Sequence, residues 1–150
     1  CPLLFGGLMA QIKIVQTGES AGLVGADGGA GEFVFASFPY NAASVDATFF
    51  VATRSMAVKA ITCKPTVAGT DGGAVTAVIR KVPDATAIAS GTALHSSTYN
   101  LKGTAVTNQA LTVSTTASDL VLAAGDALAV DFTGTMTSAT GVVTVAMCPV

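Results

Sequence analysis

The sequence predicts an all-β fold, and three observations support this. Short apolar runs alternate with polar residues at the two-residue period of a β-strand. Turn signals built from Gly, Asp, Asn and Pro separate these runs throughout the chain. No capped run has an apolar period of 3.6 residues, so we expect no helix. Roughly eight to ten short strands at fairly regular spacing are typical of a β-sandwich, a jelly roll or a barrel.

The clearest pattern lies in residues 119–145. Leu128, Val130 and Phe132 alternate with small or polar residues, which predicts a strand with one buried face. The preceding residues 123–126 end in Gly-Asp, where Gly accepts a positive φ and Asp can bond its own backbone. With the connection at 133–140 and the β-branched run Val142–Val145, this stretch predicts three strands and two turns in succession.

The same criteria predict the other strands. In chain order they are Gln11–Val15, Glu32–Phe38, Val45–Val51, Ala57–Pro65, Ala74–Val82, Ser97–Leu101, Gln109–Val113, Asp119–Leu122 and Val142–Val145. Alternation places Phe33 and Phe35 on one face of their strand and Val34 on the other, and residues 39–41 are expected to close that strand. A Gly-rich turn at 66–73 predicts that the strands on either side of it form a hairpin.

The chain is long enough for one domain, since 150 residues bury roughly 70% of the surface of the unfolded chain. We expect residues 1–31 to form an extended N-terminal arm with a Gly-rich loop at 17–31, and residues 32–150 to form the sandwich domain. The apolar residues of the arm are too few for a secretory signal and lack a basic region before them. No apolar run approaches the ~20 residues that a membrane-spanning helix needs.

Charge and cysteine content limit which partners and metal sites we expect. The net charge is −2 and the seven Lys and Arg are scattered, so we expect no nucleic-acid partner. The three cysteines show no Cys-x-x-Cys or Cys/His spacing, so no zinc site is expected. They are either unpaired thiols or include a Cys63–Cys148 bridge, if the strands that carry them are neighbours.

No catalytic constellation is found. The single histidine, His95, has Ser96, Ser97 and Asp84 near it in sequence, but there is no Gly-x-Ser-x-Gly elbow. We therefore expect His95 to be an exposed loop histidine and the protein not to be an enzyme.

The carboxylates and aromatics also lack a functional pattern. Asp71 and Asp126 lie in turns, where Asp commonly bonds the backbone, and no Asp-x-Asp-x-Asp-Gly spacing indicates calcium. The Gly-rich loop lacks the helix and the Lys-Ser/Thr pair of a phosphate-binding loop. Phe49, Phe50 and Tyr40 can form a stacking platform for a sugar or base, but strand alternation favours the core. No metal or cofactor is expected.

Three stretches carry a resemblance to a known family: Thr66–Val82, Ala89–Ala105 and Asp119–Thr135. In their succession of strands and turns they resemble the small jelly-roll decoration, or cement, proteins of tailed-bacteriophage capsids. The resemblance covers about the last two-thirds of the chain. It implies an antiparallel, jelly-roll-like β-sandwich and a non-enzymatic virion protein. Such a protein sits on the outer capsid surface, bridges major capsid protein subunits and resists the pressure of packaged DNA.

This resemblance also suggests where contacts lie. We expect capsid or subunit contacts from apolar residues of the arm and the Gly-rich loop, namely Leu3, Leu4, Phe5, Leu8, Met9, Leu23 and Val24. A symmetric lattice favours symmetric subunits, so a homo-oligomer, a dimer or a trimer, is expected. The alternative is a carbohydrate-binding or adhesion β-sandwich module, against which the absence of Trp and the presence of only two Tyr weigh mildly.

Overall fold

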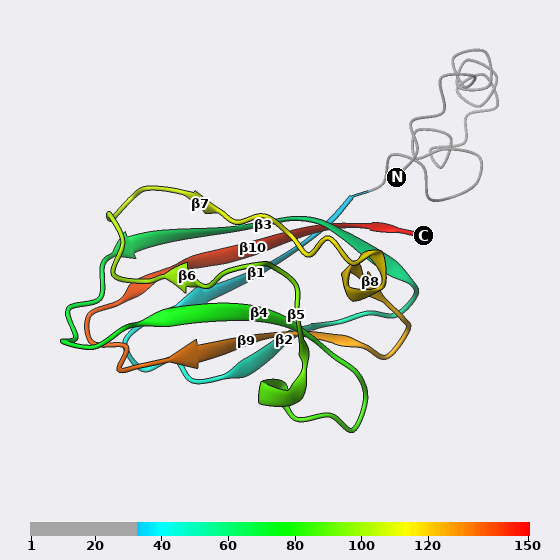
Figure 1. The fold of residues 1–150 in the computed structure, drawn as a ribbon, viewed down its shortest axis with the longest axis horizontal. Coiled ribbons are helices and arrows are strands. Elements are labelled where there is room, and N and C mark those ends of the chain that lie inside the picture. The colour runs from blue at the N-terminus through cyan, green and yellow to red at the C-terminus, as the bar shows by residue number, and fades with distance from the viewer. Residues whose placement is uncertain (1–32) are drawn as a thin grey trace, which may run out of the picture.

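The computed structural model describes residues 33–150, which form two five-stranded antiparallel sheets packed face to face (Figure 1). The strands are β1 (Val34–Tyr40), β2 (Ala47–Val51), β3 (Met56–Val67), β4 (Thr76–Val82), β5 (Thr92–Ala93), β6 (Tyr99–Asn100), β7 (Gln109–Ala110), β8 (Val121–Leu122), β9 (Ala127–Thr133) and β10 (Thr140–Pro149). Two 3-10 turns, η2 (Ile88–Ser90) and η3 (Ala117–Leu120), are the helical elements of this part of the chain. The predicted all-β sandwich is confirmed.

Each sheet is built around two long strands. Sheet A has the order β1-β10-β3-β7, with β8 pairing β3, and sheet B has the order β2-β9-β4-β5, with β6 pairing β4. The full-length strands β1 and β2 form one edge of each sheet, while two-residue strands complete the other edges. The long strands thus determine the shape of the sandwich, and the region from 83 to 122 finishes it with short pairings.

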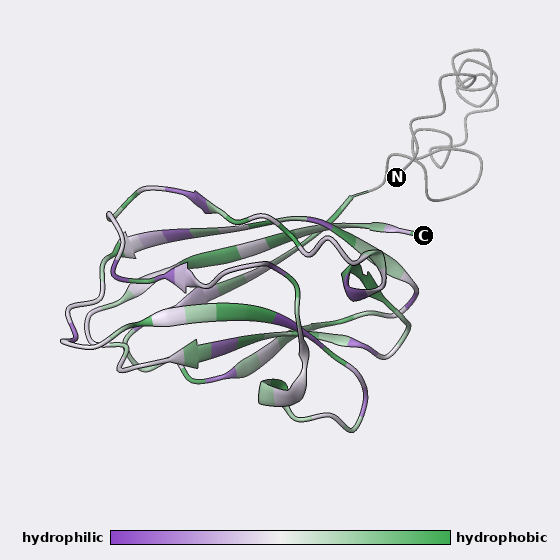
Figure 2. Cartoon of the chain, viewed as in Figure 1, coloured by the Kyte–Doolittle hydropathy of each residue, from purple (hydrophilic) through white to green (hydrophobic). Residues whose placement is uncertain are grey.

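The core lies between the sheets. Alternation turns Ile61 and Cys63 of β3 toward Ile79 of β4 and Leu128 of β9, and all four side chains are buried. Figure 2 shows hydrophobic residues along the central strands of both sheets. The Tyr99 hydroxyl crosses the core to donate to the Ile61 carbonyl at 2.8 Å, so the buried polar atom that this tyrosine brings is satisfied.

Several strands are longer than predicted. β1 continues through Pro39 and Tyr40, which were expected to close it, and β10 runs from Thr140 to Pro149 rather than over four residues. A proline is tolerated because β1 is an edge strand, where one backbone N–H needs no partner in the sheet. β3 likewise extends through Val67, because β10 pairs along almost its whole length.

The hairpin predicted across residues 66–73 is wrong. β3 pairs with β10 in sheet A, whereas β4 pairs with β9 in sheet B, so the Gly-rich connection carries the chain from one sheet to the other. Both strands have one apolar face, and packing those faces against each other buries more apolar surface than pairing the strands side by side would.

Three predicted strands shrink to two residues each. β6 keeps only Tyr99–Asn100 of the predicted 97–101, β7 keeps only Gln109–Ala110, and β8 keeps only Val121–Leu122, because residues 117–120 form η3. Val113, the last residue of the predicted strand Gln109–Val113, makes an isolated bridge with His95.

The Cys63–Cys148 bridge, one of the two possibilities for the cysteines, is not formed. Cys63 carries a free, buried thiol.

Two glycines at positive φ provide a matched test of the turns. A Cβ at Gly134 (φ 90°) would lie 2.0 Å from the Ala74 carbonyl oxygen, whereas a Cβ at Gly125 (φ 95°) would meet nothing within 4 Å. We expect Gly125→Ala to lower the free energy of unfolding by about 1 kcal/mol, through backbone strain alone. Gly134→Ala adds a backbone clash, so we expect about 3 kcal/mol or more. Urea denaturation compares the two, and equal losses would contradict the packing at Gly134.

Candidate functional site

We call the outward side of sheet A the A face. It consists of Phe35, Ser37 and Pro39 of β1, Val142, Thr144 and Ala146 of β10, and Ala60, Thr62 and Lys64 of β3, which cross-strand pairing places in three rows. None of these nine residues is buried by other parts of residues 33–150. Most carry small or apolar side chains, and Ser37 and Thr144 satisfy each other through their hydroxyls at 3.1 Å.

Two phenylalanines stand at one end of the A face. Phe33 and Phe35 stack with ring centroids 6.4 Å apart and an interplanar angle of 24°. They are 52% and 67% exposed, whereas Phe49 and Phe50 pack against the core, as alternation predicted. Two exposed, stacked aromatic rings beside a nearly uncharged sheet surface are typical of a protein–protein contact.

The charged side chains near the A face are both lysines. Lys64 pairs with Val142 of β10. Lys59 lies at a register shift in β3, between Ala60, which pairs with Ala146, and Val58, which pairs with Met147. Within residues 33–150 neither lysine forms an ion pair, and both are exposed. The six aspartates of this part of the chain accept hydrogen bonds elsewhere, namely Asp46, Asp71, Asp84, Asp119, Asp126 and Asp131. The A face is therefore apolar with a basic component.

The outward side of sheet B is different because the chain covers part of it. The Arg80 guanidinium forms an ion pair with Asp131 at 2.7 Å and donates to the Gly91 carbonyl at 2.9 Å. The turn η2 packs on β9 in the same region, and Ala129, which points outward, is fully buried. Residues 83–91 thus cover sheet B, whereas no described segment covers the A face.

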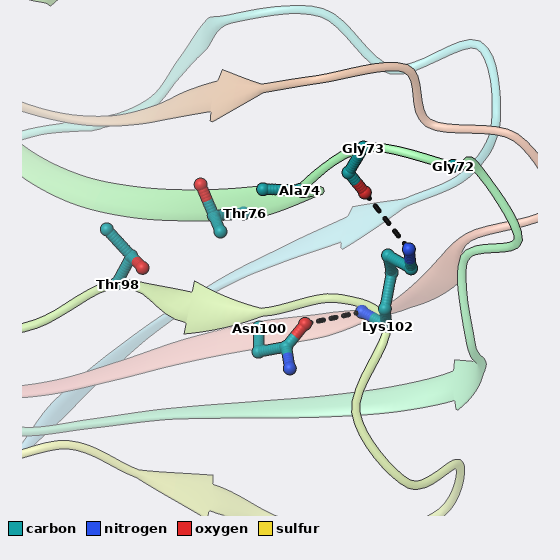
Figure 3. A pocket seen from close by; sticks show the side chains of 7 residues that line it. All are labelled: Gly72, Gly73, Ala74, Thr76, Thr98, Asn100 and Lys102. Carbon is teal, nitrogen blue, oxygen red and sulfur yellow. Dashed lines mark hydrogen bonds between the residues drawn. The ribbon is translucent and has the colours of Figure 1, made fainter.

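A pocket of about 530 Å³ opens beside β4 and β6 (Figure 3). Its lining residues are Gly72, Gly73, Ala74, Thr76, Thr98, Asn100 and Lys102. The Lys102 ammonium donates to the carbonyls of Asp71 at 2.5 Å and Gly73 at 3.0 Å, which ties the 68–75 connection to the turn that follows β6. Hydroxyl, amide and ammonium groups line this pocket without an aromatic platform.

The structure corrects the expectation for His95. The ring is buried, with 6% of the residue exposed. Its Nε2 accepts the backbone N–H of Ile79 at 2.9 Å, and its Nδ1 bonds the carbonyl of Ser97, so Nδ1 carries the proton of a neutral ring. Both nitrogens are used by backbone groups, and the Asp84 carboxylate accepts the Ala85 N–H instead of approaching the ring. His95 therefore holds the 92–101 segment on β4.

A second buried group lies in the core near sheet A. The Tyr40 hydroxyl is 3.8 Å from the Cys63 sulfur, and burial raises the pKa of both groups, that of Cys63 to about 11. A thiol with a raised pKa is a poor nucleophile, so Cys63 acts as a small apolar core residue. Tyr40, considered above as part of a stacking platform, is also buried.

The predicted contact residues of the arm and Gly-rich loop lie outside the described residues. These are Leu3, Leu4, Phe5, Leu8, Met9, Leu23 and Val24. In the described range 33–150, no three His, Cys, Asp or Glu side chains gather as metal ligands, and no helix has the length and apolar character to cross a membrane. The A face was not predicted from the sequence. Alternation distinguishes the two faces of a strand, but it does not show which of the two faces another element covers.

Comparisons with known proteins give structural similarity at a low level. No family model and no curated protein matches this chain. A chain from the disulfide-linked pili of Bacillus endospore appendages matches at 15% identity and a TM-score of 0.42, over 79% of this chain and 86% of that one. A chain from infectious bursal disease virus, Gx strain, matches at 16% identity and a TM-score of 0.31, over 79% of this chain and 30% of that one. Likeness at these identities and TM-scores does not indicate a shared function.

The environment of His95 predicts acid sensitivity. Burial lowers the pKa of His95, and the positive charge of Arg80 lowers it further, although the bond to the Ser97 carbonyl acts in the opposite direction. The stabilisation is fully present above the unfolded pKa of about 6.5 and is lost as the pH falls toward the lower folded pKa. We expect the free energy of unfolding to fall below about pH 6.5 in the wild type.

Because His95 is the only histidine, an imidazole NMR titration assigns the effect directly. The control is His95→Gln, which should be less stable at pH 7 and lack this pH dependence between about 6.5 and 5. A folded pKa at or above 6.5 would contradict the buried, neutral ring.

Proposed function

We propose that this protein is a structural virion protein that binds the outer surface of a phage capsid and stabilises it by bridging major capsid protein subunits. The observation that carries the proposal is the A face, an exposed sheet surface of mostly small and apolar residues with the stacked Phe33 and Phe35 at one end. Such a surface suits docking on another protein, because it loses little hydration of charged groups when it is covered.

The architecture suits a protein that must withstand mechanical force. Ten strands in two sheets, the cross-core bond from Tyr99 to Ile61 and the Arg80–Asp131 ion pair join distant parts of the chain into one rigid body. A rigid module can transmit force between the subunits that it touches. The family resemblance of residues 66–82, 89–105 and 119–135 agrees with this role, and the arm residues Leu3 to Met9 would extend the contact area beyond the sandwich.

We further propose that the protein acts as a homo-oligomer, a dimer or a trimer, on the capsid lattice. Copies on a symmetric lattice meet equivalent neighbours, and weak contacts repeated over many sites bind with high avidity. Size-exclusion chromatography with light scattering measures the state of the free protein, and electron microscopy of decorated capsids measures the state on the lattice.

The test is co-sedimentation with capsids assembled without this protein, followed by electron microscopy. We expect saturable binding at fixed lattice positions. Replacing Phe35 with Ser should weaken binding about tenfold or more, because it removes a large exposed aromatic ring that the partner would bury. The matched control is Val45→Ser, which removes a 73%-exposed apolar side chain outside the A face and should leave binding unchanged. Absence of binding by the wild type would overturn the proposal.

The pocket beside β4 and β6 favours a second candidate, a carbohydrate-binding module. Thr76, Thr98 and Asn100 offer hydroxyl and amide groups of the kind that bind sugar hydroxyls. On a glycan array this candidate predicts specific binding that Asn100→Ala weakens by about tenfold, while Phe35→Ser leaves it intact. A blank array together with capsid binding would reject it.

A further inference from the structure

Strand β1 has an outer side that no other strand of residues 33–150 pairs. It ends the strand order of sheet A, and its seven residues pair with β10 in an unbroken register from Val34 to Tyr40. The other full-length edge strand, β2, has an irregularity between Thr48 and Phe50. The strands at the opposite edges are only two residues long. Among the described strands, β1 is therefore the edge best shaped to add another strand.

The edge at β1 also lacks charge. Residues 33–45 and 133–150, which include β1 and its neighbour β10, contain no Asp, Glu, Lys, Arg or His. Edge strands of soluble proteins commonly carry a charge, above all that of lysine, which prevents pairing with another chain. Pro39 is the one residue of β1 unsuited to pairing, and it lies one position from the end of the strand. It removes a single N–H group and leaves the middle of β1 able to pair.

Phenylalanine side chains make the same edge apolar. Phe38 of β1 packs on Phe49 and Phe132 in the core, with ring centroids 5.7 Å and 6.2 Å away, and all three side chains are only partly buried. Phe35 points outward from the same strand and is 67% exposed. A strand added beside β1 would therefore cover apolar surface on both sides of sheet A as well as pair backbone groups.

The sequence of β1 fits a second copy of itself. Antiparallel strands place paired residues on the same face of a sheet, and full overlap of the seven residues sets Ser37 opposite Ser37 on a two-fold axis. In this register Phe35 lies opposite Pro39 on the outward side, and Phe38 lies opposite Ala36 on the inward side. A large side chain meets a smaller one in each of these pairs, and no charge opposes another.

We propose that the free protein forms a two-fold dimer by antiparallel pairing of β1 with β1 of a second copy, centred on Ser37. A second copy presents a strand that is already extended, whereas a disordered peptide would lose conformational entropy on ordering at this edge. The pairing joins the two A sheets into one continuous sheet with both A faces on the same side. This inference concerns the free protein and holds whether or not a capsid is the binding partner.

Sedimentation equilibrium of the full chain over a range of concentrations tests the proposal. We expect a reversible monomer–dimer equilibrium, which Ser37→Lys weakens about fivefold or more because two like charges then face each other on the two-fold axis. The matched control is Thr144→Lys, which adds the same charge to the A face and removes the same hydroxyl bond between Ser37 and Thr144. It lies on β10, one strand away from the edge, so we expect it to leave the dimer unchanged.

Urea denaturation checks that both lysine variants remain folded. A wild type that stays monomeric at every concentration would overturn the proposal. Equal weakening of the dimer by both variants would also overturn it, because that result indicates that the copies stack through their A faces.

Disulfide trapping tests the register of the pairing. The two Ser37 positions face each other in the dimer, so Ser37→Cys should form a 37–37 link between copies during air oxidation with copper phenanthroline, as identified by peptide mapping. Thr48→Cys, at an exposed position on the edge strand β2, is the control and should form no 48–48 link. A dimer that yields no 37–37 link, or one that yields the 48–48 link in its place, would contradict pairing through β1.

Discussion

The contact between the inner faces of the two sheets is the constraint on which the rest of the structure depends. β3 and β10 of sheet A meet β4 and β9 of sheet B, and the side chains between them are small or medium in size, with Tyr40 and Tyr99 as the largest that are fully buried. Because the layer is thin and apolar, each polar atom inside it needs a partner, and the hydroxyls of both tyrosines have one. Packing the two sheets against each other determines which face of each strand points outward.

The outward faces of the two sheets differ in whether residues 33–150 cover them. On sheet B, residues 83–91 return over β9 and are held by Arg80, which bonds both Asp131 and the Gly91 carbonyl. On sheet A, no element within residues 33–150 returns, and Phe35 with its row of small neighbours stays exposed. Burying apolar surface is favourable, so the outward face of sheet A is the described surface that would gain more from a cover.

His95 shows how a single polar residue organises the connecting region. The strands from β5 to β8 are only two residues long and supply few ladder hydrogen bonds, so this region needs other links. The neutral ring supplies two bonds to backbone groups, and its backbone bridges Val113. The same burial that makes the ring an effective link also makes it sensitive to acid, since protonation removes the acceptor at Nε2.

The sequence by itself determined the fold class, the long strands and the inward residues such as Leu128 and Val130, because alternation and turn chemistry are local properties. It also showed that Asp126 serves a turn. Only the tertiary structure decided that β3 and β4 belong to different sheets, that His95 is buried and that Phe35 remains exposed. Those outcomes depend on which distant segment covers a given face, and residue spacing along the chain does not contain that information.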